Sequence, residues 1–239
     1  MTFANHEWFP APTDLTLLPD DVHIWRIKLE RSQLELEGLL TTLCGDEVAR
    51  ANRFYFQQHR ERFIAGRGIL RAILGRYLKI EPQAVQFNYE AQGKPLLADK
   101  FASSGLSFNL SHSQDLALCA VTTHHLIGVD LEYIRSVSNV ESLAQRFFAP
   151  REYAIVRSLP PDQQQQVFFR YWTCKEAYLK ATGVGIAHLE KVEISLTPES
   201  PAKLNIKEEW SLVELVPAPN YVAATAVAGS KFHLKCWQY

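Results

Sequence analysis

The sequence predicts an α+β protein made of two similar lobes that face each other across a cleft. Its 239 residues are 47% hydrophobic and 21% charged, a composition typical of a globular protein with a full core. That length allows one large domain or two of about 120 residues. Each half also shows the same order of elements, namely a strand, helices, a strand and a hairpin. We therefore predict a first lobe over residues 1–125 and a second over residues 126–239, related by a pseudo-twofold axis.

In the first half, apolar and polar residues alternate over short segments, which is the pattern of half-buried strands. The predicted strands are residues 22–30, 85–89, 106–110 and 116–122. Residues 47–78 carry an almost unbroken helical pattern. Gly66, Gly68 and Gly75 lie inside it, and glycine weakens helices, so we expect this helix to be divided or bent there.

The second half repeats this order. Its predicted strands are residues 126–134, 192–196, 210–216 and 221–227, and its predicted helices are residues 140–148 and 167–182. The tripeptide Arg-Phe-Tyr at 53–55 is echoed by Arg-Phe-Phe at 146–148. A repeat that occurs only twice is a modest signal, but it favours two lobes, and ligand sites are common where two lobes meet.

The charge pattern excludes several classes of protein. The net charge is −1, so no overall positive field attracts nucleic acid or an anionic membrane. The four cysteines have no paired spacing, and we expect reduced, mostly packed thiols. The first residues lack a basic segment followed by an apolar one, and no apolar run approaches the roughly 20 residues of a membrane helix. We expect a cytoplasmic protein with no nucleic-acid or membrane partner.

Two carboxylates stand out on the strand predicted at residues 126–134. Asp130 and Glu132 alternate with apolar residues, so both side chains project from one face of the strand. Gly128 precedes them and permits close approach of another backbone or a ligand. Adjacent carboxylates repel each other, and a hard cation such as Mg²⁺ relieves that repulsion. The alternative is a strand with a solvated acidic face.

A third carboxylate lies on the helix predicted at residues 167–182. Helical spacing places Trp172, Glu176 and Lys180 on one face, with Lys175 alongside. A surface helix with an ordinary Glu–Lys pair would look the same. The helix is strongly apolar, however, which predicts that these charges lie at the edge of a cleft. Together with the acidic pair they provide metal ligands and phosphate-binding lysines, the minimum set for phosphoryl-transfer chemistry.

Four motifs in this order resemble those of the 4′-phosphopantetheinyl transferases, in the larger monomeric type known from surfactin synthesis. They are Gly93-Lys94-Pro95, Phe108 to Ser113 (FNLSHS), Gly128 to Glu132 (GVDLE) and Trp172 to Gly183 (WTCKEAYLKATG). Such enzymes move the 4′-phosphopantetheine arm of coenzyme A onto a serine of an apo carrier protein and release 3′,5′-ADP. The resemblance covers residues from about Arg53 to Gly183. It implies an Mg²⁺-dependent transferase that acts as a monomer.

The resemblance also implies a role for each matching residue. Asp130, Glu132 and Glu176 would hold Mg²⁺ against the pyrophosphate of coenzyme A. Glu176, or a water that it orients, would take the serine proton, and Lys180 would stabilise or protonate the departing 3′,5′-ADP. The remaining predicted contacts to coenzyme A are Lys175 near the phosphates, Arg62, Ser111 and His112 at the 3′-phosphate, and Lys94 and Pro95 at the adenine. Carrier recognition is expected around residues 147–157.

The sequence departs from the pattern in one place. Members of this type carry lysines ahead of the Arg-Phe-Tyr segment, whereas residues 46–50 here keep only Arg50 as a cation. Binding of the 3′-phosphate would then depend more on Arg62 and His112. Arg67 is a possible substitute, although we interpret it first as a solvated arginine on the helix surface.

Two further functions fit parts of the pattern. A catalytically silent module could bind coenzyme A or a carrier protein, but such a module need not keep three carboxylates and two lysines. A different Mg²⁺-dependent phosphate enzyme, such as a nucleotide hydrolase or kinase, would be expected to carry a glycine-rich phosphate loop. No GxxxxGK[ST] motif is present, and Gly66-Arg-Gly68 does not continue to a third glycine.

Overall fold

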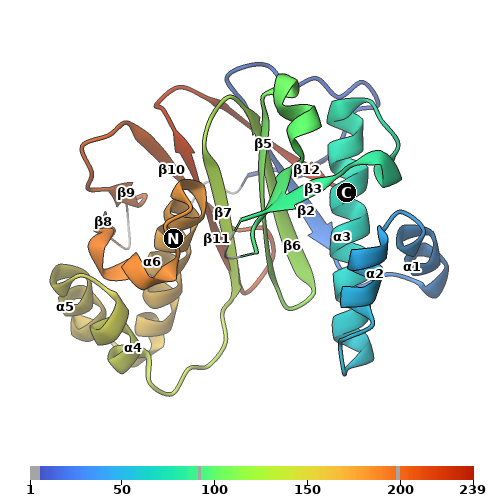
Figure 1. The fold of residues 1–239 in the computed structure, drawn as a ribbon. Coiled ribbons are helices and arrows are strands. Elements are labelled where there is room, and N and C mark those ends of the chain that lie inside the picture. Colours follow the sequence, from blue (N-terminus) through green and yellow to red (C-terminus); the bar gives the residue numbers. More distant parts are fainter. Residues whose placement is uncertain (1–5, 91–92, 198–199) are drawn as a thin grey trace.

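The computed structural model describes residues 6–90, 93–197 and 200–239. Two β-sheets lie side by side in the middle of the molecule, with long helices on the outer flanks (Figure 1). The first sheet has the order β1-β12-β2-β6-β5, and the second has the order β10-β11-β7. Their strands are β1 (Phe9–Pro10), β2 (Asp21–Lys28), β5 (Leu106–Ser113), β6 (Leu116–Thr123), β7 (Ile127–Tyr133), β10 (Trp210–Leu215), β11 (Tyr221–Ala228) and β12 (His233–Gln238).

Helices cover the outer face of each sheet. Helix α3 (Gln57–Leu78) packs on the first sheet and α6 (Pro161–Thr182) on the second. The smaller elements are α1 (Gln33–Leu40), α2 (Gly45–Ala51), α4 (Val140–Phe147), α5 (Pro150–Ser158), the 3-10 helices η1 (Pro82–Ala84), η2 (Asp99–Ser104) and η3 (Ile186–Lys191), and the short strands β3 (Phe87–Tyr89), β4 (Pro95–Leu97), β8 (Ile194–Ser195) and β9 (Lys203–Leu204). This arrangement is the predicted two-lobe α+β fold.

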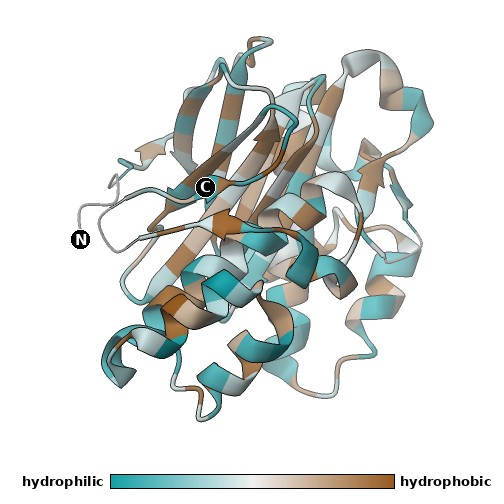
Figure 2. Ribbon diagram, turned by 90° about the vertical axis from the view of Figure 1, so that its left-hand side faces the viewer, coloured by the Kyte–Doolittle hydropathy of each residue, from teal (hydrophilic) through white to brown (hydrophobic). Residues whose placement is uncertain are grey.

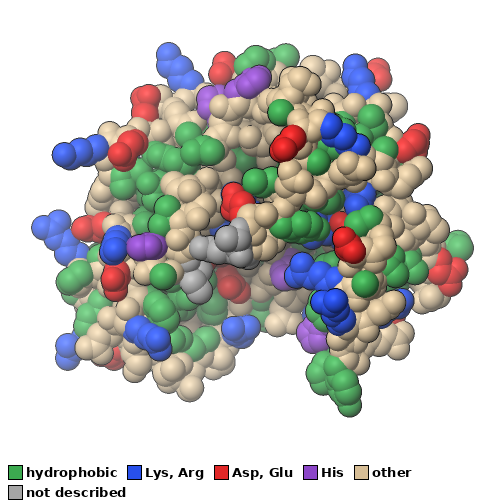
Figure 3. Space-filling view, viewed as in Figure 1, with side chains coloured by type: hydrophobic (Ala, Val, Ile, Leu, Met, Phe, Trp, Pro, Cys, Tyr) green, Lys and Arg blue, Asp and Glu red, His purple; other side chains and the backbone are tan. Residues whose placement is uncertain are grey.

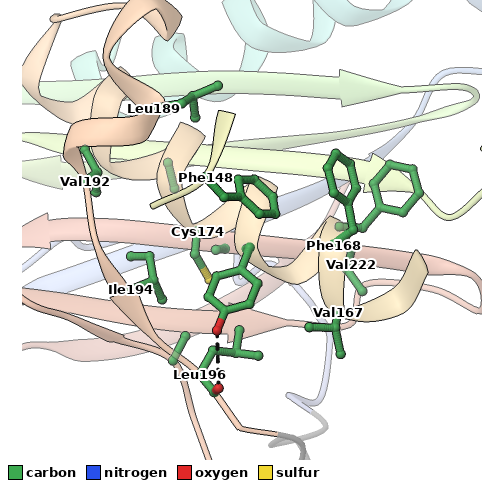
Figure 4. Close-up of a cluster of buried hydrophobic side chains, with 14 of the residues drawn as sticks. Phe148, Val167, Phe168, Cys174, Leu189, Val192, Ile194, Leu196 and Val222 are labelled. Atoms are coloured by element: carbon green, nitrogen blue, oxygen red, sulfur yellow. Dashed lines mark hydrogen bonds between the residues drawn. The ribbon is translucent and has the colours of Figure 1, made fainter. Parts of the chain in front are cut away.

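The hydrophobic core is divided into three layers. One cluster lies between α3 and the first sheet, and a second lies between α6 and the second sheet. The third lies between the two sheets and includes Ile24 of β2, Leu118 of β6 and Val129 of β7. Brown, hydrophobic segments accordingly run through the strands inside the molecule in Figure 2. Figure 4 shows the second cluster, where Phe148, Phe168 and Cys174 pack together.

The final strand crosses from the second half of the sequence to the first lobe. β12 pairs in parallel with β2, from His233 opposite Asp21 to Gln238 opposite Arg26. The strand was not predicted, because no motif marks the end of the chain. A division of the chain at residues 125/126 stays a prediction, and in the structure the residues of β12 lie with the first lobe.

Several helices differ from the predictions: α1 was not predicted, and α6 begins at Pro161 and not at residue 167. α3 runs without a break through Gly66, Gly68 and Gly75, and the helical pattern is interrupted instead at residues 52–56. Gly68 permits close packing, because a Cβ there would lie 2.8 Å from the Cβ of Leu39 on α1. The predicted division at the glycines is therefore wrong. The sequence pattern also missed α5, which begins with a proline at its first turn.

The cysteines are reduced, as their spacing predicted. All four cysteines are free thiols, and Cys119, Cys174 and Cys236 are buried. In the part of the chain that the structure describes, no helix has both the length and the apolar content needed to cross a bilayer.

Candidate active site

β7 places two carboxylates on the face that meets α6. Val129 and Leu131 point into the core between the sheets, so Asp130 and Glu132 point the other way, as the alternation predicted. Gly128 brings the strand close to the helix, because a Cβ at this position would lie 2.0 Å from the carbonyl oxygen of Ala177. Asp130 is buried, and Glu132 is partly exposed.

α6 presents the third carboxylate and a lysine to this strand. Glu176 and Lys180 are one turn apart, and Lys180 Nζ lies 2.5 Å from Asp130 Oδ1. The same ammonium donates to Ser111 Oγ at 3.0 Å, and Ser111 Oγ donates to Asp130 Oδ1 at 3.0 Å. The structure therefore brings together the two predicted motifs, which are about 40 residues apart in the sequence. Trp172 packs instead on Phe147 and Phe168 in the core of the second lobe.

Burial and mutual repulsion raise the pKa values of two of these carboxylates. Burial, and then the neighbouring charge of Asp130, raise the pKa of Glu176 from 4.5 to about 7, against the opposing effect of Lys180. Burial and Asp130 also raise the pKa of Glu132, while the hydrogen bond from Ser113 lowers it. Crowding three carboxylates in a partly buried place favours proton uptake or the binding of a cation.

The donor set fits a hard divalent cation. All of its groups are oxygen ligands, and Asp130 Oδ2 is buried with no hydrogen-bond partner. Among the described residues, however, no three His, Cys, Asp or Glu side chains lie in positions from which they could coordinate one metal ion together. Lys180 Nζ forms an ion pair with Asp130 in this arrangement.

A cavity of about 430 Å³ opens beside Glu176 and Lys180. Lys94 and Pro95, from the first lobe, line it as well. Lys94 Nζ donates to the carbonyl oxygen of Lys180 at 2.6 Å, and burial lowers the pKa of Lys94. Figure 3 shows acidic, basic and histidine side chains gathered around a hollow in the centre of this face. The cavity thus joins residues predicted for the adenine to residues predicted for the phosphates.

The three residues predicted at the 3′-phosphate differ in how far they are buried. Ser111 is buried, and its hydroxyl is engaged with Asp130 and Lys180. His112, its neighbour on β5, is exposed. Arg62 is partly buried, and its Nε has no hydrogen-bond partner. The joint role of these three side chains at the 3′-phosphate therefore stays a prediction.

Arg67 is not the solvated arginine that the helical pattern favoured. Only 7% of its surface is exposed, and its Nε lies 3.4 Å from Glu47 Oε1. Its guanidinium stacks over the rings of Phe87 and Tyr89. Glu47 and Tyr89, which contact Arg67, line a hollow of about 750 Å³ together with Arg50. The sequence could not show this burial, because it depends on the packing of α2 and the β3–β4 hairpin against α3.

Lys175 pairs with Glu152 and not with the carboxylates of the site. The prediction that Lys175 contacts the phosphates is corrected accordingly. Its side chain is fully buried, and its Nζ lies 2.5 Å from Glu152 Oε2. It also donates to the carbonyl oxygens of Leu189 and Val192. A lysine enclosed by a carboxylate and two carbonyl groups has no free donor for a phosphate, and it joins α6 to α5 and η3 instead.

Sequence reasoning missed two polar residues of β5. Asn109 Oδ1 accepts the backbone N–H of Val129 at 2.9 Å, and Ser113 Oγ donates to Glu132 Oε2 at 3.1 Å. The alternation of Asn109, Ser111 and Ser113 with less polar neighbours was a usable signal, because these positions share one face of the strand.

Comparison with known proteins places this site in a family. Residues 28–124 match the model of the N-terminal part of 4′-phosphopantetheinyl transferases, and residues 126–226 match that of the 4′-phosphopantetheinyl transferase superfamily. The chain is 63% identical to 4′-phosphopantetheinyl transferase HetI of Nostoc sp. (strain PCC 7120) over 98% of this chain and 99% of the relative.

More distant relatives extend the comparison. The chain is 26% identical to 4′-phosphopantetheinyl transferase Sfp of Bacillus subtilis (strain 168), over 79% of this chain and 83% of that protein. It is 28% identical to the L-aminoadipate-semialdehyde dehydrogenase-phosphopantetheinyl transferase of Xenopus laevis, over 84% of this chain and 74% of that protein.

Proposed function

The chain belongs to the 4′-phosphopantetheinyl transferase superfamily, and from this premise we propose how its residues transfer the arm of coenzyme A to a carrier protein. The observation that carries the proposal is the meeting of Asp130 on β7 with Glu176 and Lys180 on α6, beside a cavity that reaches the first lobe. Coenzyme A is the donor, and a serine hydroxyl of an apo acyl, polyketide or peptidyl carrier protein is the acceptor.

The reaction exchanges one P–O bond for another. The serine oxygen attacks the β-phosphorus of coenzyme A, and the bond from that phosphorus to the bridging oxygen breaks. The electron pair leaves with 3′,5′-ADP, and Lys180 stabilises or protonates the departing oxygen. Glu176, or a water that it orients, takes the serine proton. In the metal-free protein burial raises the pKa of Glu176 to about 7, and bound Mg²⁺ would lower it again, so a water that Glu176 orients is kept as the alternative proton acceptor.

Asp130, Glu132 and Glu176 are the residues that we propose hold Mg²⁺, supported by the unpartnered Oδ2 of Asp130 and the raised pKa values of the two glutamates. When bound, Mg²⁺ supplies charge stabilisation to the pyrophosphate oxygens. The coenzyme also contacts Lys94 and Pro95 at the adenine and Arg62, Ser111 and His112 at the 3′-phosphate in this proposal. We leave Lys175 out, because its ammonium is enclosed in the core.

Mass spectrometry of an apo carrier protein tests the transfer. Incubation with enzyme, coenzyme A and Mg²⁺ should add the mass of one phosphopantetheine arm, and a carrier whose acceptor serine is replaced by alanine should stay unmodified. Asp130→Ala should abolish transfer and leave the fold intact, whereas Asp14→Ala, a change at an exposed acid, should leave both unchanged. Wild-type rates in the Asp130 variant would remove this residue from the site.

We also propose that one chain is the working unit, in the cytoplasm. Lys94 of the first lobe and Glu176 of the second line the same cavity, so the site needs no residue of a second copy. The four free thiols suit a reducing compartment. We propose no nucleic-acid or membrane partner, in keeping with the net charge of −1. Light scattering at working concentration should give the mass of one chain, and a dimer mass would contradict the proposal.

Carrier docking is proposed at residues 147–157. α5 lies in this segment and exposes two cations, since the side chain of Arg151 is 87% exposed and that of Arg157 66% exposed. They suit acidic carrier proteins by charge complementarity. Reversing both charges to glutamate should raise the KM for the carrier and leave the KM for coenzyme A unchanged. An unchanged KM for the carrier would place the docking surface elsewhere.

A further inference from the structure

Edge strands of the two sheets lie side by side next to the carboxylates. β5 ends the first sheet and β7 ends the second, and the two strands are not paired in one sheet. Side chains of β5 bridge them instead. Asn109, Ser111 and Ser113, each two residues apart, bond respectively to Val129 N–H, to Asp130 Oδ1 and to Glu132 Oε2. Two serines on one strand are therefore matched in register to two carboxylates on the other.

The hydroxyl of Ser113 has its orientation set by the backbone of β7. Its oxygen accepts the N–H of Tyr133 at 3.1 Å and donates its only proton to Glu132 Oε2 at 3.1 Å. A serine hydroxyl has one proton to donate. Because Tyr133 directly follows Glu132, the hydroxyl ties the glutamate carboxylate to the backbone of its own strand.

Glu132 needs such a tie more than its neighbour does. Asp130 has a short side chain, is buried and is held by Lys180. Glu132 has a longer side chain and is partly exposed, and Asp130 projects from the same face of β7 and repels it. Rotation toward solvent would relieve this repulsion and would take the carboxylate away from the cluster. The hydrogen bond from Ser113 opposes that rotation.

We propose that Ser113 is a positioning residue that holds Glu132 in place to bind the divalent cation, an inference that rests on the metal site of the proposed function. Groups that hydrogen-bond to a metal ligand orient it, and their removal lowers metal affinity about 10- to 100-fold. In this role Ser113 acts through Glu132, to which its hydroxyl donates. Ser111 is a poorer probe, because its hydroxyl is shared by Asp130 and Lys180.

Mn²⁺ binding in the presence of coenzyme A tests the role without requiring turnover. Titration followed by electron paramagnetic resonance should show about tenfold weaker Mn²⁺ binding for Ser113→Ala, and recovery for Ser113→Thr, which keeps the hydroxyl. Ser211→Ala is the matched control, since it removes a hydroxyl that donates to the carbonyl oxygen of Gly229 from β10, the other edge strand of the sheet that contains β7. In transfer assays the KM for Mg²⁺ should rise in the Ser113→Ala variant more than kcat falls.

A double-mutant cycle separates positioning from a general effect on the fold. In a Glu132→Gln background the further change Ser113→Ala should not weaken Mn²⁺ binding again, because its effect passes through the carboxylate. Equal weakening in both backgrounds, or wild-type affinity in Ser113→Ala, would overturn the inference while leaving the transferase function intact. Wild-type protein that transfers the arm but does not bind Mn²⁺ would overturn both the metal site and the role of Ser113.

Discussion

Glu176→Gln is expected to stabilise the metal-free protein above neutral pH while removing its transferase activity. Glu176 is 7% exposed and lies on α6, beside the carboxylates of β7. Burial, and next the charge of Asp130, raise its pKa to about 7. The native state therefore holds a proton on this carboxyl group that the unfolded chain, with an ordinary pKa of 4.5, releases earlier.

The sign and the size of the effect follow from this difference. Below about pH 4.5 the group is protonated in both states and costs nothing. Between about pH 4.5 and about 7 the unfolded chain has released this proton while the native state still holds it, so the free energy of unfolding falls as the pH rises, and the loss is complete above about 7. At about 1.36 kcal/mol for each pH unit, the difference between 4.5 and about 7 amounts to at most about 3 kcal/mol. Water at the cleft screens part of this.

Urea unfolding of both proteins in EDTA, from about pH 5 to about pH 8, measures the effect directly. The free energy of unfolding of the wild type should fall across this range relative to that of Glu176→Gln. Thermal unfolding should show the variant several degrees higher at about pH 8, at roughly 2–4 °C for each kcal/mol. Glu81→Gln, a change at an exposed glutamate, is the matched control and should follow the wild type.

Parallel pH profiles for the wild type and Glu176→Gln would refute this reasoning, because they would mean that the carboxyl ionises in the native state as easily as in the unfolded chain. Added Mg²⁺ and coenzyme A should reduce the difference between the two proteins, since a bound cation favours the ionised carboxylate. A variant that retains transfer would separately remove Glu176 from the chemistry.

Three further predictions concern the frame around the site. Lys175→Met should lower the free energy of unfolding by roughly 3–5 kcal/mol, because it leaves Glu152 buried and unpaired. Adding Glu152→Gln should recover much of this loss in urea unfolding. Equal stability of Lys175→Met and the wild type would contradict the prediction. Burial lowers the pKa of His23 from 6.5 to about 4, so stability should fall as the pH drops through this window, because only the unfolded chain takes up the proton. His23→Gln should flatten that part of the profile, and an unchanged acid limb would show that other groups cause it. Gly128→Ala should lower the Tm and abolish transfer, since its Cβ would lie 2.0 Å from a carbonyl oxygen of α6, whereas Gly38→Ala meets nothing within 4 Å and should preserve both.

Local periodicity was sufficient to predict several parts of the site. Alternation along residues 126–134 placed Asp130 and Glu132 on one face, and helical spacing placed Glu176 beside Lys180. Both patterns are geometric consequences of a single strand or helix, so they do not depend on what packs against it. The two-lobe α+β fold followed from the repeated order of such elements, and the motif resemblance correctly indicated the family.

The sequence pattern of a single helix or strand could not show which side chains of a neighbouring element contact it. Lys175 is next to Glu176 in the sequence, but about 100° around the helix, and the packing of α5 decided that it pairs with Glu152. Likewise, the glycines of α3 suggested a bend, whereas the close approach of Leu39 explains Gly68 within a continuous helix. These outcomes depend on contacts between segments far apart in the sequence.

The sequence by itself therefore determined the family, the fold class and which charged side chains share a face. Only the tertiary structure decided that the face of β7 meets the face of α6, that Ser111 and Ser113 reach across from β5, and that β12 joins the first sheet beside β2. The physical reason is that periodicity is set by backbone geometry within one element. The meeting of faces is set instead by the burial of apolar surface between elements, which brings the carboxylates together despite their mutual repulsion.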